Sequence, residues 1–272
     1  MNTLAQSRLG KFFRHAAAII AVAATALLPV RAISGESFSP PPQVGLYELR
    51  IYTAADGKMP ELDARFRDHT ISLFRKHGMT PIAFFHPDNA DDHRLIYLMG
   101  YRDRAARDAA WTAFASDPEW TAVKRASEAN GALTTKIESL FLVPTDYSPA
   151  LDLRSATPPR YFELRTYTTN PGKLENLHSR FRDYTLGIFR KHGMTNMLYW
   201  RPGADQPGME SKMIYLMAYP SKDARNSAWA AFAADDEWKK VAADSQVDGP
   251  ILAATAGVVS IEMKPTDYSP LN

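Results

Sequence analysis

The chain has 272 residues, of which 45% are hydrophobic and 23% charged, as expected for a folded protein long enough to form two domains. Its formal net charge is only +2, and four of its basic residues lie in the first 32 positions, so the remainder has no basic field for nucleic acid. Cysteine is absent, which excludes disulfides, thiol catalysis and cysteine-ligated metals.

The start of the chain has the pattern of a secretory signal peptide. Three basic residues precede an apolar run over residues 16–28, and small residues follow at the positions that a signal peptidase reads, Val30 and Ala32. The apolar run is too short to span a bilayer comfortably. We therefore expect residues 1–32 to be removed on export to the periplasm or medium, leaving no stable membrane span. A proline-rich extended leader is expected over residues 33–45.

A repeat organises the rest of the sequence. Residues 65–80 carry a block of charged and aromatic residues that recurs at 180–195, an offset of 115 residues. A period of this length indicates two whole domains. The predicted boundaries are 46–145 for the first domain, 146–159 for the linker and 160–268 for the second domain.

Both domains predict the same order of elements. In the first domain we expect a strand over 47–53, a helix from about 59 to 77, strands over 80–86 and 95–101, a helix from Asp103 that Pro118 interrupts, and a strand over 135–143. This order, βαββαβ, is ferredoxin-like and belongs to the α+β class.

The first strand of each domain alternates strictly and so has two different faces. Tyr47, Leu49 and Ile51 form an apolar face in the first domain. The opposite face is polar in both domains, and its members are the candidate ligand-binding residues Glu48, Arg50, Tyr52, Glu163, Arg165 and Tyr167.

The repeated strand, helix and cap motifs resemble the NIPSNAP family. They are residues 47–52, the Gly57-Lys58 turn, the blocks at 65–70 and 74–80, and the region of Trp120. The resemblance implies a dimeric α+β barrel, in which two ferredoxin-like sheets pack face to face. One chain carries both halves here, so the barrel is expected to close within the chain as a pseudo-dimer.

A closed barrel would place the polar strand face inside it. Two interpretations follow for Glu48 and Arg50 and for their repeats, Glu163 and Arg165. They form structural ion pairs at the interface between the halves, or they line a polar pocket for an anionic or carbonyl-bearing ligand.

His69 is the candidate catalytic residue. It lies at a helical spacing from Leu62, Phe66 and Leu73, so the pattern predicts a buried position on the apolar stripe. Such a histidine is either structural or a base or haem ligand. Tyr184 occupies its place in the second domain, so any two such sites would differ.

No common catalytic motif is present, and no metal site or cofactor is predicted. Whether the protein is an enzyme stays open. The leading hypothesis is binding, either of a small molecule in the barrel or of a protein partner on its outside. The alternative, implied by the wider barrel superfamily, is a cofactor-independent monooxygenase or haem-related enzyme. A purely structural role is the third hypothesis, and a filled barrel would favour it.

Overall fold

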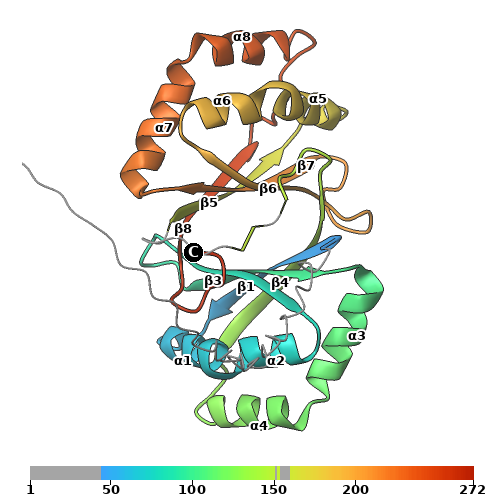
Figure 1. Ribbon diagram of the computed structural model, residues 1–272, viewed down its shortest axis with the longest axis vertical. Helices are drawn as coiled ribbons and strands as arrows, with labels where there is room; N and C mark the ends of the chain where they lie inside the picture. Colours follow the sequence, from blue (N-terminus) through green and yellow to red (C-terminus); the bar gives the residue numbers. More distant parts are fainter. Residues whose placement is uncertain (1–43, 151, 154–159) are drawn as a thin grey trace, which may run out of the picture. The chain divides into compact units, whose positions relative to one another are not determined.

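The computed structural model describes residues 44–150, 152–153 and 160–272. Their strands close into an eight-stranded barrel in the order β1-β3-β2-β8-β5-β7-β6-β4, with helices outside it (Figure 1). The predicted signal peptide and most of the predicted leader lie outside the described residues.

Each half of the barrel is one βαββαβ unit. The elements of the first unit are β1 (Leu46–Ala54), α1 (Met59–Arg65), η1 (Phe66–Thr70), α2 (Ile71–Lys76), β2 (Thr80–Pro87), β3 (Arg94–Tyr101), α3 (Arg104–Ala115), α4 (Pro118–Ser127) and β4 (Thr134–Pro144). The elements of the second unit are β5 (Tyr161–Thr168), α5 (Leu174–Arg180), η2 (Phe181–Thr185), α6 (Leu186–Lys191), β6 (Thr195–Pro202), β7 (Lys212–Tyr219), α7 (Lys222–Ala234), α8 (Asp236–Asp244) and β8 (Val258–Pro265).

Aspartate side chains begin the helices that follow the central hairpin of the first unit. Asp103 accepts a hydrogen bond from the Ala106 amide and caps α3, and Asp117 accepts one from the Glu119 amide and caps α4. Pro118 occupies the first turn of α4, where a missing N–H is tolerated. The predicted interruption at Pro118 is therefore confirmed as a boundary between two helices.

The two sheets join at two short seams. At one seam Phe85 of β2 pairs with Pro265 of β8, and at the other Leu142 of β4 pairs with Pro202 of β6. All strand pairs are antiparallel. The predicted α+β class and the barrel closed within one chain are both confirmed.

Apolar side chains from both sheets fill the barrel interior. They include Leu49, Leu98, Leu164, Leu216, Trp200 and Met263. The cavity left between them measures about 10 Å³, roughly the room that one water molecule needs. Small-molecule pockets usually measure about 300–1,000 Å³, so this interior has no room for a ligand of ordinary size.

The expected orientation of the polar strand face is wrong. Tyr47, Leu49 and Ile51 pack in the barrel interior, whereas Tyr52 packs with the helices on the outer face of the sheet. Glu48 and Arg50 therefore lie between sheet and helices. The physical reason is that both faces of each sheet are covered, so alternation alone does not decide which face turns inward. The apolar set lies between the two sheets, and the charged residues find partners on the helices that cover the other face.

Candidate functional site

A buried carboxylate stands at the centre of the polar face of β1. Glu48 is fully buried, and its two oxygens accept hydrogen bonds from four residues. These donors are Arg50 at 2.5 Å, Arg107 at 2.8 and 2.9 Å, Ser139 at 2.7 Å and Tyr101 at 3.2 Å. The hydrogen-bond donors to the carboxylate thus come from β1, β3, α3 and β4. Through Arg107 of α3 the carboxylate connects the helix layer to the sheet.

The guanidinium of Arg50 is surrounded by hydrogen-bond acceptors and an aromatic ring. Its Nε donates to Tyr97 at 2.8 Å and its Nη2 donates to Tyr52 at 3.2 Å. Its guanidinium carbon lies 4.4 Å from the centre of the Trp111 ring, a cation–π distance. The structure therefore brings Glu48, Arg50 and Tyr52 together, as the alternation predicted, but as a paired network.

The second unit repeats this network except at Arg165 Nε and the Tyr215 hydroxyl, which are buried without partners where Arg50 Nε donates to Tyr97. Glu163, also fully buried, accepts from Arg165 at 2.6 Å, Arg225 at 2.7 Å and Ser260 at 2.5 Å. Arg165 also donates to Tyr167 at 3.3 Å. Both copies are ion pairs, as the structural interpretation of the polar face predicted, but they lie between sheet and helices and not at the interface between the halves.

These contacts control the protonation of both glutamates. Burial alone would raise the pKa of Glu48, but the hydrogen bonds from Arg107 and the charge of Arg50 outweigh it and lower the pKa to about 2. Glu163 behaves in the same way, with Arg225 and Arg165 lowering its pKa to about 2. Both carboxylates are therefore ionised in the folded protein at every physiological pH.

We expect the free energy of unfolding to fall in acid because of these two groups. A pKa that is depressed in the folded state contributes stability above the ordinary value near 4.5, and that stability is lost as the pH falls toward 2. Denaturant unfolding at pH 7, 4 and 3 should show this loss. A Glu48→Ala variant should lose less stability than the wild type over the same range. An equal slope in both proteins would contradict the assignment.

The predicted burial of His69 is wrong. Residues 66–70 form a π-helical turn, which carries one residue more than an α-helical turn. The extra residue brings Thr70 into the core and leaves His69 exposed. Its imidazole makes no hydrogen bond or ion pair within the described part of the chain, and Tyr184 is likewise 53% exposed.

A separate pocket of about 220 Å³ lies between sheet and helices in the first unit. Six of its thirteen lining residues are aromatic and come from β1, η1, α2, α3 and α4, namely Tyr52, Phe66, Phe74, Trp111, Phe114 and Trp120. Phe114 and Trp120 pack with ring centres 4.5 Å apart. Of the candidate residues named from sequence, only Tyr52 lines this pocket.

Arg65 supplies the buried charge in the pocket wall. It ends α1, donates to Glu128 at 2.8 Å and lies with its guanidinium carbon 5.5 Å from the centre of the Trp120 ring. Its Nε is buried and has no hydrogen-bond partner. An unsatisfied buried donor is costly, so Arg65 is the polar lining residue whose hydrogen bonding is least complete. Sequence reasoning missed Arg65 as a site residue.

No group of three or more histidine and acidic residues within residues 44–150, 152–153 and 160–272 is arranged to hold a metal ion. No helix within those ranges has the length and apolar character needed to cross a membrane.

The comparisons agree with the repeat and with the fold. The NIPSNAP family model matches the chain twice, over residues 47–149 and 162–270. A NIPSNAP family protein from Agrobacterium tumefaciens is 28% identical, over 38% of this chain and 96% of that one, with a TM-score of 0.35. A search of curated proteins gave no match.

Two further solved structures cover both units. An anthrone oxidase-like protein is 11% identical, over 83% of this chain and 93% of its own, with a TM-score of 0.52. A protein proposed to be a monooxygenase, from Lactobacillus acidophilus, is 12% identical, over 82% of this chain and 94% of its own, with a TM-score of 0.50. At these identities the likeness shows the fold alone.

Proposed function

The chain belongs to the NIPSNAP family, and from that premise we propose that it binds a small aromatic molecule between the sheet and the helices of its first unit. The observation that carries this proposal is the 220 Å³ pocket with six aromatic side chains and the buried guanidinium of Arg65 among its lining residues. The filled barrel interior argues against the position inside the barrel that the sequence suggested and, taken alone, favours the purely structural hypothesis. The pocket outside the barrel is what supports binding instead.

The volume of the pocket limits the ligand to about one ring. An engineered apolar cavity of roughly 150 Å³ binds benzene, so about 220 Å³ suits one ring with a short substituent. Aromatic walls favour a flat ligand, because stacked and edge-on ring contacts add to the area that is buried. The charged guanidinium of Arg65 in the pocket lining favours an oxygen substituent, such as a hydroxyl or carbonyl group, on that ring.

Binding is a better supported proposal than oxygenation. The monooxygenase alternative rests on a likeness of fold at 11–12% identity. The histidine suggested as its base, His69, is exposed and does not line the pocket. Export, which residues 1–32 predict, is a separate proposal on which the binding site does not depend.

The proposal is tested by filling the pocket. Toluene, phenol and benzaldehyde serve as probes in ligand-observed NMR titrations of the wild type and of an Ala115→Phe variant. Ala115 lines the pocket, so a phenyl group there should compete with the ligand and weaken binding at least about tenfold. We expect the two oxygen-bearing probes to bind more tightly than toluene.

Ala233→Phe is the matched control. Ala233 occupies the same place in the second unit, one residue after Phe232, and does not line the pocket. The affinities of the Ala233→Phe variant for the three probes should equal those of the wild type. Absence of binding by all three probes, or equal affinity in the Ala115→Phe variant, would refute the proposed site.

A further inference from the structure

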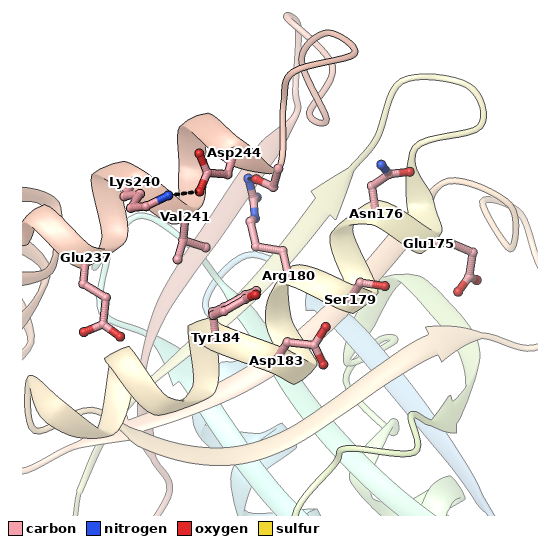
Figure 2. A pocket seen from close by; sticks show the side chains of 11 residues that line it. Glu175, Asn176, Ser179, Arg180, Asp183, Tyr184, Glu237, Lys240, Val241 and Asp244 are labelled. Atoms are coloured by element: carbon pink, nitrogen blue, oxygen red, sulfur yellow. Dashed lines mark hydrogen bonds and ion pairs between the residues drawn. The ribbon is translucent and has the colours of Figure 1, made fainter.

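The second unit contains a larger groove, of about 710 Å³, between α8 and the segment formed by α5 and η2. Figure 2 shows the side chain of Arg180, the last residue of α5, extending into the space between these helices. Arg180 lines the groove although only 5% of its surface is exposed. A guanidinium in such a position needs hydrogen-bond acceptors from the protein or from a ligand.

The protein supplies very few acceptors to Arg180. Its Nη1 donates to the Ser245 hydroxyl at a long 3.4 Å, and its Nε is buried without a partner. The Trp238 ring centre lies 5.3 Å from the guanidinium carbon. Arg180 makes no ion pair with any residue that the structure describes. Burial lowers its pKa, yet an arginine side chain stays protonated in proteins.

In the first unit the equivalent arginine has a carboxylate partner that Arg180 lacks. The repeat counterpart of Arg180 is Arg65, which donates to Ser127 at 3.4 Å and also to the Glu128 carboxylate at 2.8 Å. Ser127 has its counterpart in Ser245, but the position of Glu128 is occupied by Gln246. One difference between the repeats therefore removes the carboxylate from the second site.

Gln246 does not replace the lost acceptor. Its side-chain nitrogen donates to the Ala242 carbonyl at 2.9 Å, and its side-chain oxygen accepts from the Ile251 amide at 3.2 Å. Both ends of the amide are thus used within the second unit. The Arg180 guanidinium keeps unused donors next to a groove that reaches solvent.

We propose that this Arg180 groove binds the carboxylate of a small molecule, which takes the place that Glu128 fills in the first unit. The fork of donors on arginine matches the geometry of a carboxylate. This site is distinct from the aromatic pocket, and the inference does not rest on the proposed function.

The remaining charges of the groove restrict the rest of the ligand. The lining includes four acidic residues, which are Glu175, Asp183, Glu237 and Asp244. The second cation in the lining, Lys240, pairs with Asp244, and Glu237 pairs with Lys191 from outside the groove. Glu175 and Asp183 are the lining acids with no ion pair in the described part of the chain. A dianion such as phosphate would meet repulsion from these acids, whereas a ligand amine would be attracted to them. The ligand class that fits is a small amino acid with its carboxylate toward Arg180.

Calorimetric titration of the full chain tests this site with four probes, which are 4-aminobutyrate, butyrate, butylamine and inorganic phosphate. We expect one 4-aminobutyrate per chain, weaker binding of butyrate, and no binding of butylamine or phosphate. In a Gln246→Glu variant an internal carboxylate should occupy Arg180 as Glu128 occupies Arg65. Its affinity for 4-aminobutyrate should fall at least about tenfold, and its melting temperature should rise.

Two further variants test whether Arg180 itself binds the carboxylate and whether the effect is specific to this groove. Arg180→Met removes the guanidinium and should also abolish binding, so it answers the question if Gln246→Glu fails to fold. Asp267→Ala removes an exposed ion pair, does not touch the lining of the groove, and should leave the affinity of the Arg180 groove unchanged. A wild type that binds neither carboxylate, or binding that persists in the Arg180→Met variant, would overturn the proposal.

Discussion

Replacing Glu48 with alanine is expected to lower the free energy of unfolding by about 3–5 kcal/mol, the cost of breaking a buried ion pair. The carboxylate is fully buried and accepts hydrogen bonds from two arginines. Its removal would leave the charges of Arg50 and Arg107 facing each other without compensation. Glu163→Ala should have an effect of the same size, because the second unit repeats the network.

Denaturant unfolding monitored by tryptophan fluorescence measures this effect, and Asp267→Ala is its control. Asp267 pairs with Arg67 at 2.7 Å, but both side chains are largely exposed, so its loss should cost no more than about 1 kcal/mol. If Glu48→Ala were no more destabilising than Asp267→Ala, the network would not be the structural support described above.

Separating the two units is expected to abolish the monomeric fold. Each sheet would then expose the apolar face that the other sheet now covers, including Leu49 and Leu98 in one unit and Leu164 and Leu216 in the other. Exposed apolar patches of that kind drive association. Polypeptides spanning residues 44–149 and 160–272 should each form dimers or aggregate when expressed alone.

Size-exclusion chromatography with light scattering gives the mass of each separated unit. The intact chain, run in parallel, is the control for association caused by other surfaces. Two soluble, well-folded monomers at the masses of the single units would contradict the account of the barrel as one shared core.

The order of elements could be predicted from sequence because it depends on local patterns. Alternation marks β1 and β5, and Asp103 and Asp117 mark the starts of α3 and α4. The repeat then extends each assignment to the second unit. Alternation separates two faces of a strand, but it does not say which face the helices cover, and so the predicted orientation of Glu48 and Arg50 was wrong.

His69 was misplaced for a local reason. A helical pattern assumes about 3.6 residues per turn, and the π-helical turn at residues 66–70 breaks that period. The turn puts Thr70 in the core, and its hydroxyl donates to the Arg65 carbonyl at 3.0 Å. The residue types in this segment do not predict a π-helical turn.

The two pockets depend on packing that a sequence does not contain. The aromatic pocket of the first unit is formed by side chains from helices and strands far apart in the chain. The sequence does contain one signal for the second site. Aligning the two repeats places Gln246 opposite Glu128 while Arg180 matches Arg65, so the second repeat keeps the arginine and loses the acid beside it.

The most direct test of the central claim, that the ligand site lies under the helices and outside the barrel, is a crystal structure of the protein soaked with phenol. We expect a phenol ring among Trp111, Phe114 and Trp120, with its oxygen within hydrogen-bond distance of Arg65. A phenol ring inside the barrel, between Leu49 and Leu164, or an empty pocket at saturating phenol would contradict it.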